Sequence, residues 1–97
     1  MSESPDIRLK RLRLRAWRRG TKEMDLILGG FADARLAGLA PGTLAAFEGL
    51  LEENDQDLYA WILGYAAPPA ALAPLVGEIA AHAQMLSADG GTASPGA

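Results

Sequence analysis

The chain has 97 residues, which is enough for one domain with a single modest core. Hydrophobic residues make up 49% of it and charged residues 22%, the balance of an ordinary folded, soluble domain. The absence of Cys excludes a disulfide framework, a thiolate metal site and a cysteine nucleophile, and the single His has no carboxylates at the spacing that a zinc or iron site needs.

The formal charge of −3 hides an uneven distribution along the chain. Residues 1–22 hold eight of the nine Lys and Arg and two acids, a charge of +6, whereas residues 23–97 hold one Arg and ten acids, a charge of −9. A basic arm before an acidic body is typical of a protein with an anionic or mixed-charge partner. It is equally typical of a solvated helix face, so the charge pattern leaves both interpretations open.

Targeting and membrane signals are weak. No apolar segment follows the first basic residues, and Glu3 and Asp6 lie among them, so we expect neither a secretion signal nor a mitochondrial presequence, and a cytoplasmic protein. The charge-free run from Leu58 to Gly77 is about as long as a membrane span, but Pro68-Pro69 interrupts it and Ala and Gly supply much of it. Two amphipathic segments joined by a turn explain this run better, and no membrane span is expected.

The first predicted helix follows Ser4, which can cap it, with Pro5 at its first position. Its apolar residues continue to Trp17, and Gly20 is a natural stop because glycine adopts the left-handed conformation without a Cβ clash. The alternation over Leu12–Arg15 would also fit a short strand, so the pattern there is ambiguous.

Thr21 can cap a second helix, in which Met24, Leu28 and Phe31 fall at i, i+4 and i+7 and form a buried stripe. The pair Gly29-Gly30 lies inside this helix and should weaken or bend it, since each Gly costs about 1 kcal/mol relative to Ala.

Residues 38–42 are predicted to form a loop, and a third helix should begin near Thr43. Asp55 is a plausible N-cap for a fourth helix. Tyr59 lies off the apolar stripe of that helix and is predicted to be exposed. The buried stripes expected for these two helices are Leu44, Phe47, Leu50 and Leu51, and then Leu58, Trp61, Ile62 and Tyr65.

A fifth helix should follow Pro68-Pro69, with Pro74 in its first turn or two and apolar residues at helical spacing as far as Leu86. From Ser87 onward the composition is that of a disordered tail. The sequence therefore predicts an all-α protein, a compact bundle of about five short helices. Its expected organisation is a flexible N-terminus at residues 1–5, one helical-bundle domain at 6–86 and a disordered tail at 87–97.

No arrangement of nucleophile, base and orienting group is visible. Ser occurs only at positions 2, 4, 87 and 94, and His82, in the predicted last helix, lacks a positioned partner, so it is predicted to be structural or exposed. The acidic cluster at residues 52–57 lacks the glycine and the ligand spacing of a calcium loop. The protein is therefore predicted not to be an enzyme and to hold no metal.

The segment Arg19-Gly20-Thr21-Lys22-Glu23 lies where the first predicted helix meets the second. In a purely structural interpretation, Arg19 sits near the negative end of one helix, Gly20 turns the chain, and Glu23 sits near the positive end of the next. The same residues also place an arginine fork and a carboxylate at an exposed corner, which can hydrogen-bond a partner of mixed charge.

This segment resembles the RGxxE motif of the succinate dehydrogenase flavinylation (FAD assembly) factors. The residues that follow, Met24-Asp25-Leu26-Ile27-Leu28 with Phe31-Ala32, are similar to those of bacterial members. Leu50-Leu51-Glu52 and the segment from Asp55 to Trp61 resemble the LLE and DxDLxxW segments of the family. The resemblance covers roughly Arg11 to Gln84.

The resemblance implies a five-helix bundle that acts as a chaperone or assembly factor. Members help to attach FAD covalently to a His of the flavoprotein subunit of succinate dehydrogenase, and in some bacteria of fumarate reductase. Arg19, Gly20 and Glu23 would engage the flavoprotein, and Arg11 matches a further recurrent arginine. FAD would belong to the partner, so no stably bound cofactor is expected.

Two other functions stay open at this point. The Arg-rich first helix could bind nucleic-acid phosphates, although the acidic remainder of the chain would repel a long polyanion, so no nucleic acid is expected. The chain could also be a regulatory protein-binding module.

Overall fold

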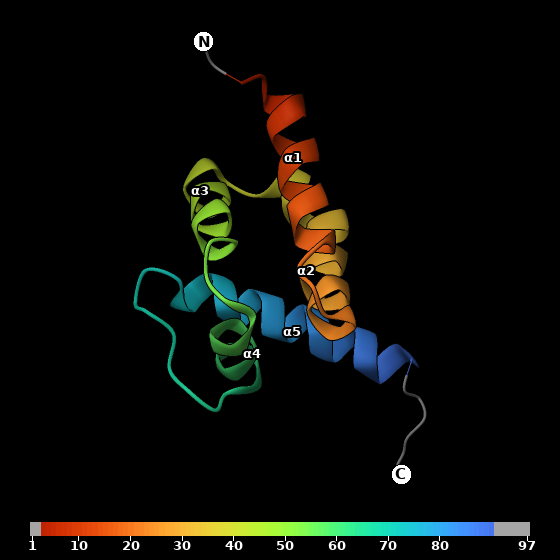
Figure 1. Cartoon of the computed structure of the whole chain (residues 1–97), viewed down its shortest axis with the longest axis vertical. Helices are drawn as coiled ribbons and strands as arrows, with labels where there is room; N and C mark the ends of the chain where they lie inside the picture. The colour runs from red at the N-terminus through yellow and green to blue at the C-terminus, as the bar shows by residue number, and fades with distance from the viewer. Residues whose placement is uncertain (1–2, 91–97) are drawn as a thin grey trace.

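Five α-helices and one short 3-10 helix make up the described part of the chain, residues 3–90 of the computed structural model (Figure 1). This confirms the predicted all-α class. The strand alternative at residues 12–15 is excluded, because these residues lie inside a continuous helix. The elements are α1 (Pro5–Trp17), α2 (Lys22–Arg35), η1 (Leu36–Gly38), α3 (Pro41–Leu50), α4 (Asp55–Leu63) and α5 (Ala73–Gly90).

The helices form two groups that are joined by α5. α1 and α2 lie side by side as a hairpin, α3 and α4 follow on the other side of the molecule, and α5 runs across both groups (Figure 1). α5 contacts α2, α3 and α4, so its apolar residues close the core from one side. Within residues 3–90, no helix has the length and hydropathy needed to cross a membrane.

Side-chain caps start the first two helices as predicted. The Oγ of Ser4 accepts a hydrogen bond from the backbone N–H of Ile7 at 3.2 Å, and Pro5 is the first residue of α1. The Oγ1 of Thr21 accepts one from the N–H of Met24 at 3.3 Å and starts α2. Each cap satisfies a backbone donor that would otherwise lack a partner in the first turn.

Asn54, and not Asp55, caps α4. The backbone of Asn54 is extended (φ −80°, ψ 156°), and its Oδ1 accepts a hydrogen bond from the N–H of Asp57 at 2.9 Å. The prediction that Asp55 is the cap is wrong, because Asp55 is already the first helical residue and its carboxylate accepts a hydrogen bond from Arg19.

α4 ends before Tyr65. Gly64 adopts the left-handed conformation (φ 84°) and terminates the helix. Tyr65, which was predicted on the apolar face, therefore lies outside α4 and is strongly exposed. Leu58 and Ile62 are buried as predicted, and Trp61 is partly buried against the core.

Three helices begin or end outside the limits predicted for them or for the terminal segments. α3 begins at Pro41, two residues before Thr43, because proline is favourable at the first position of a helix. α5 has Pro74 in its first turn as predicted, but it continues to Gly90 and so includes residues 87–90 of the predicted tail. Likewise, α1 includes Pro5 from the predicted flexible N-terminus.

The remaining parts of the two terminal predictions, residues 1–2 and 91–97, lie outside the described residues.

One continuous core fills the space between the helices. Phe31 of α2 and Phe47 of α3 stack with ring centroids 5.9 Å apart, and the imidazole of His82 meets the Phe31 ring edge-on at 5.8 Å. Both Phe side chains are fully buried, as their helical phase predicted. The buried core residues are Leu12, Ala16, Met24, Leu28, Phe31, Ala32, Leu36, Phe47, Leu50, Leu51, Leu58, Ile62, Leu72, Leu75, Val76 and Ile79.

Gly29 allows α1 and α2 to approach each other closely. A Cβ atom at this position would lie 2.2 Å from Cδ2 and 2.4 Å from Cε2 of the Trp17 indole, far inside van der Waals contact. The Trp17 ring packs on the bare backbone, and its Nε1–H donates a hydrogen bond to Asp33 of α2 at 3.2 Å. Gly29 therefore provides the space for a tryptophan, and α2 remains a continuous helix across the glycine pair.

Candidate functional site

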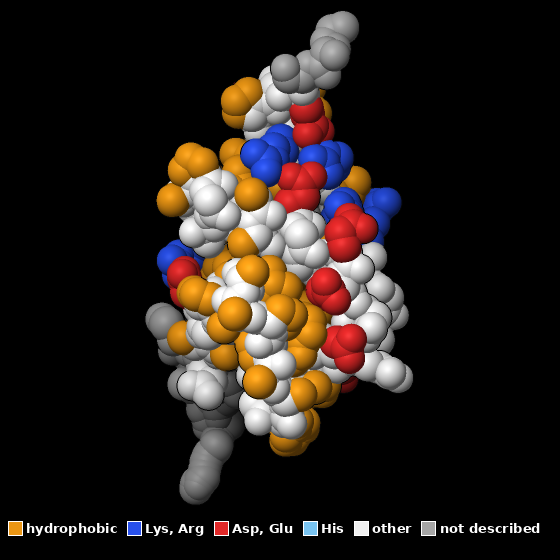
Figure 2. Space-filling view, turned by 90° about the vertical axis from the view of Figure 1, so that its left-hand side faces the viewer, with side chains coloured by type: hydrophobic (Ala, Val, Ile, Leu, Met, Phe, Trp, Pro, Cys, Tyr) orange, Lys and Arg blue, Asp and Glu red, His pale blue; other side chains and the backbone are white. Residues whose placement is uncertain are grey.

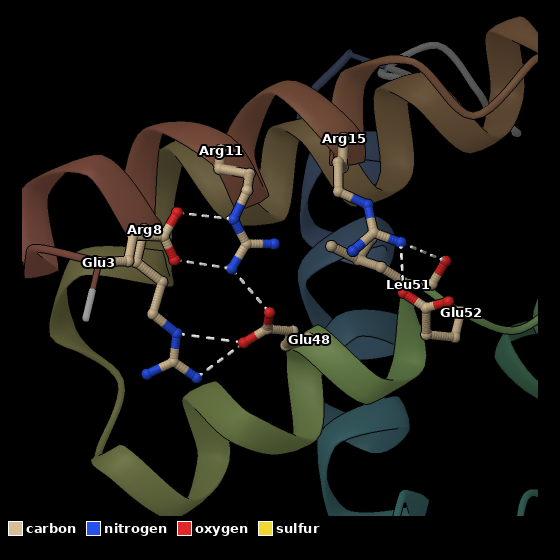
Figure 3. A network of polar contacts seen from close by, with 7 residues as sticks. All are labelled: Glu3, Arg8, Arg11, Arg15, Glu48, Leu51 and Glu52. Carbon is tan, nitrogen blue, oxygen red and sulfur yellow. Dashed lines mark hydrogen bonds and ion pairs between the residues drawn. The ribbon is translucent and has the colours of Figure 1, made fainter. Parts of the chain in front are cut away.

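Four arginines along α1 and the turn that follows it reach across to α3 and to the start of α4. We call Arg8, Arg11, Arg15 and Arg19 the arginine ladder; Figure 3 shows the first three. Their spacing of three, four and four residues places them on one side of the α1 helix and its continuation. The backbones of α1 and α3 make few close approaches, so these long side chains bridge the gap between them.

Glu48 of α3 receives two of the ladder arginines. Arg8 donates to its Oε1 from Nε at 3.1 Å and from Nη2 at 2.9 Å, and Arg11 donates from Nη2 to its Oε2 at 2.7 Å. Arg11 also makes a bidentate pair with Glu3, at 2.8 and 2.9 Å (Figure 3). Arg11, a predicted partner-binding residue, therefore has both sides of its guanidinium engaged within the chain.

Arg15 forms the next pair of the ladder. Its Nη2 donates to Glu52 at 2.7 Å and to the backbone carbonyl of Leu51 at 3.5 Å (Figure 3).

On the face seen in Figure 2, Lys and Arg side chains alternate with Asp and Glu at the upper end, and hydrophobic side chains gather below them. The basic arm thus meets acidic side chains of the same molecule.

The ion pairs change the pKa values of the groups they join. Hydrogen bonds from Arg11 and Arg8 hold the pKa of Glu48 below its ordinary value of 4.5. The hydrogen bond from Arg11 likewise lowers the pKa of Glu3, and the two carboxylates together raise the pKa of Arg11. A carboxyl group whose pKa is lowered by folding stabilises the fold above its unfolded pKa, and that stabilisation is lost as pH falls through the folded pKa.

We expect Glu48→Gln to be less stable than the wild type at pH 7 by about 0.5–1 kcal/mol, because solvent screens these partly exposed pairs. The difference should shrink as pH falls below about 4.5, where the wild-type carboxyl group becomes protonated. Thermal unfolding followed by circular dichroism at pH 7 and pH 3 measures it. Glu53→Gln is the control, since Glu53 lies between α3 and α4 and its side chain makes no ion pair with any residue in the described range. A difference that is the same at both pH values would contradict the assignment.

Arg19 is the most buried of the four arginines, with 11% of its side chain exposed. Its Nε donates to Oδ1 of Asp55 at 2.8 Å, and its two terminal nitrogens donate to the backbone carbonyls of Leu51 and Glu53. Arg19 therefore ties the end of α1 to the end of α3 and the start of α4. Its side chain satisfies carbonyls that lack a helical partner at the end of α3.

Gly20 forms the turn between α1 and α2. Its φ of +123° lies in the region that disfavours L side chains, as predicted, and a Cβ there would meet nothing within 4 Å. The Oδ1 of Asp25 accepts hydrogen bonds from the backbone N–H groups of Arg19 at 2.6 Å and Gly20 at 3.3 Å.

This role of Asp25 in holding the turn was missed by the sequence analysis. The available signal was an acid four residues after the Thr21 cap, in the first turn of α2, where it can reach back to free N–H groups.

Glu23 lies in the first turn of α2 and is exposed. It lines a hollow of about 350 Å³, which we call the corner hollow, together with Thr21, Met24, Asp55, Gln56 and Tyr59. Asp55, which accepts a hydrogen bond from the buried Arg19, lines the same hollow as the exposed Glu23. Tyr59 is exposed, as predicted.

The structure thus brings three of the four predicted site residues together at the α1–α2 corner. Gly20 and Glu23 are exposed there, whereas Arg19 points inward. Arg11 lies two turns earlier in α1, in the ladder. Within the described range, no group of three or more His, Asp or Glu side chains could hold a metal ion.

Comparison with known proteins gives a consistent picture. A family model described as flavinator of succinate dehydrogenase matches residues 10–83. The chain is similar to the FAD assembly factor SdhE of Legionella pneumophila (strain Lens), with 40% identity over 62 residues, which are 64% of this chain and 78% of that protein. No solved structure gives a significant match.

Two further relatives come from other organisms, and one of them is a mitochondrial protein. The FAD assembly factor SdhE of Vibrio cholerae is 35% identical over 68 residues, 69% of this chain and 79% of that protein. The mitochondrial succinate dehydrogenase assembly factor 2 of Debaryomyces hansenii is 39% identical over 59 residues, 61% of this chain and 42% of that protein.

Proposed function

The chain belongs to the family of flavinators of succinate dehydrogenase, and on that premise we propose that it is an assembly factor that promotes FAD attachment. It binds the flavoprotein subunit of succinate dehydrogenase, or of fumarate reductase, in the cytoplasm and favours covalent attachment of FAD to that subunit. The observation that carries the proposal is the family match over residues 10–83, which includes the corner and parts of all five helices.

The corner of Gly20 and Glu23 is proposed as the surface that meets the flavoprotein. Glu23 offers an exposed carboxylate beside the corner hollow, and Gly20 brings bare backbone to the surface next to it. Arg19 supports this surface from inside by fixing Asp55, which lines the same hollow. Arg11 stabilises the position of α1 through Glu48 and contributes to binding only through that position.

FAD and the bond-forming chemistry are assigned to the partner. The chain has no Cys, and its single imidazole, that of the partly buried His82, is packed edge-on against Phe31. An assembly factor can act without a catalytic group by binding preferentially to the flavoprotein conformation in which the His and the flavin meet, and so raising its population. We therefore propose a chaperone that binds no cofactor stably and is not an enzyme.

The ion pairs of the arginine ladder argue against the nucleic-acid alternative. Arg8, Arg11, Arg15 and Arg19 are each paired with carboxylates of the same chain, and Arg13 pairs with Asp33 at 3.4 Å. A polyanion would have to displace these intramolecular partners before it could gain a phosphate contact. The basic arm is therefore better explained as the means by which α1 docks onto the acidic body.

Deletion of the protein should leave the flavoprotein subunit present but poor in covalent FAD, with succinate dehydrogenase activity reduced in proportion. In-gel flavin fluorescence of the denatured subunit measures this, because only covalently bound flavin survives denaturation. Glu23→Ala should remain folded, since a first-turn acid contributes about 0.3–1 kcal/mol through the helix dipole. It should restore flavinylation poorly, since loss of a buried charged contact across an interface costs about 2–5 kcal/mol.

Asp6→Ala is the matched control, because Asp6 is also an exposed acid in the first turn of a helix. It should restore flavinylation as well as the wild type does. Full flavinylation in the deletion strain, with no second copy of the helper present, would refute the proposed function.

A further inference from the structure

An apolar groove lies beside the corner hollow, where α2 and α4 pack on α5. It has a volume of about 440 Å³ and is lined mainly by Leu26, Ile27, Tyr59, Leu63, Ala80 and Ala83. Glu23 and Tyr59 line both the groove and the corner hollow, so the two form one continuous surface.

Half of the exposed large hydrophobic residues in the described range line this groove. Six large hydrophobic side chains are exposed within the described range, and three of them line it: Leu26 at 50%, Leu63 at 44% and Tyr59 at 39%. Single exposed apolar residues are normal on a protein surface, whereas a contiguous exposed group marks an interaction site. The alanines of α5 leave space between these larger side chains for a partner's side chain to enter.

Helical spacing connects this group to Glu23. Leu26 and Ile27 follow Glu23 at i+3 and i+4, so the three residues lie next to one another on α2. Ile27 is partly buried and packs against the core, whereas Leu26 is half exposed. The apolar surface of α2 therefore extends from the buried stripe through Ile27 to Leu26, which remains exposed near the carboxylate of Glu23.

The charge of the lining residues determines which partner fits. Among the described residues that line the groove, Glu23 is the one charged residue, Gln84 adds a neutral amide, and none is Lys or Arg. Asp55 adds a second carboxylate in the adjoining corner hollow. An apolar segment with a basic side chain placed opposite Glu23 would complement both the shape and the charge of this surface.

We infer that the groove binds an apolar segment of the flavoprotein subunit that carries a Lys or Arg opposite Glu23. This inference rests on the proposed function and extends the contact surface from the corner along α2 and α4. Glu23 supplies the charged contact, and Leu26, Tyr59 and Leu63 supply the buried apolar contacts, which usually contribute most of the binding energy near the centre of an interface.

The first test measures binding to purified flavoprotein subunit that lacks covalent FAD. The double substitution Leu26→Gln with Leu63→Gln should weaken binding by about tenfold or more. Its melting temperature should stay close to that of the wild type, because both side chains are already half exposed. Ile7→Gln is the matched control, a hydrophobic residue 58% exposed on α1 and outside the groove. It should bind as the wild type does.

A second test does not depend on how the double variant folds. The natural chain has no cysteine, so Ala83→Cys places a single thiol in the groove and Ala45→Cys places one on the exposed side of α3. The flavoprotein should slow maleimide alkylation of the thiol at position 83 several-fold and leave that at position 45 unchanged. The intact mass of the cysteine variant measures how much of the thiol has been alkylated.

The outcomes separate this inference from the proposed function. If the wild type binds the flavoprotein and supports flavinylation, but the double variant binds equally well and the thiol at position 83 stays reactive, the groove inference is wrong and the corner alone is the contact. If sedimentation shows that the isolated chain self-associates through the groove and the flavoprotein gives no protection, the occupant is a second copy and the inference is also wrong. A wild-type chain that does not bind the flavoprotein would overturn the proposed function and the inference with it.

Discussion

Replacement of Arg19 by Ala is expected to lower the free energy of unfolding by about 2–4 kcal/mol. The substitution removes the charge-assisted hydrogen bond to Asp55 and the two donors to the carbonyls of Leu51 and Glu53. Hydrogen bonds to charged groups contribute about 1.5–3 kcal/mol each, and removing one partner of a mostly buried pair leaves the other unsatisfied. Arg19→Lys should recover only a small part, because an ammonium group cannot reproduce the planar fork that reaches three acceptors.

Urea unfolding followed by far-UV circular dichroism measures this loss. Arg18→Ala is the matched control, since Arg18 is the preceding residue, is exposed, and makes no ion pair with any residue of the described part. It should change stability by less than about 0.5 kcal/mol. Equal stability of Arg19→Ala and Arg18→Ala would contradict the inward role of Arg19.

The variants Arg19→Ala and Arg19→Lys together separate two possible roles of Arg19 in flavoprotein binding. If Arg19 acts by positioning the corner, Arg19→Lys should lose stability and binding together, even though it keeps the positive charge. If its charge contacts the partner directly, Arg19→Lys should bind better than Arg19→Ala by much more than their difference in stability. Binding measured at a temperature where both variants are fully folded distinguishes these outcomes.

Gly29→Ala is expected to destabilise the protein by about 1–3 kcal/mol, although alanine is the better helix former. A Cβ at residue 29 would overlap the Trp17 indole, which would have to leave its site and give up its hydrogen bond to Asp33. Overpacking of this kind costs about 1–3 kcal/mol or more, which exceeds the gain of about 1 kcal/mol in helix propensity.

Gly77→Ala makes the same chemical change in α5, at a position where a Cβ meets nothing within 4 Å. It should stabilise the protein by about 0.5–1 kcal/mol, so the two substitutions should have opposite signs. In a Trp17→Ala background the penalty of Gly29→Ala should disappear, because the clashing ring is gone. A penalty that persists in that background would show that the helix, and not the indole, rejects the side chain.

Much of the fold could be predicted because its signals are local. The caps at Ser4 and Thr21 and the left-handed turn at Gly20 each depend on residues within about four positions of one another. The buried stripe through Leu28 and Phe31 follows from the 3.6-residue period of the helix. At the start of α4 the prediction was displaced by one residue, because Asn54 is the cap and the predicted cap, Asp55, is the first helical residue.

The site was predicted less completely. A motif resemblance pointed to the corner and to Glu23 as a surface group, and the exposure of Glu23 agrees with that position. The same motif gave no indication that Arg19 points inward, because its partner Asp55 is 36 residues away. Nor could composition indicate that five of the eight basic residues of the arm pair with carboxylates of the same chain.

The sequence by itself determined that this protein is helical, where the first two helices begin, which residues form most of the core, and which family it resembles. Only the tertiary structure decided which arginine meets which carboxylate, why Gly29 stands opposite Trp17, and that Leu26 and Leu63 line one groove. The physical reason is the distance along the chain over which each kind of interaction acts. Caps and periodicity act along one helix, whereas each of these contacts joins elements whose relative placement is set by the packing of the whole core.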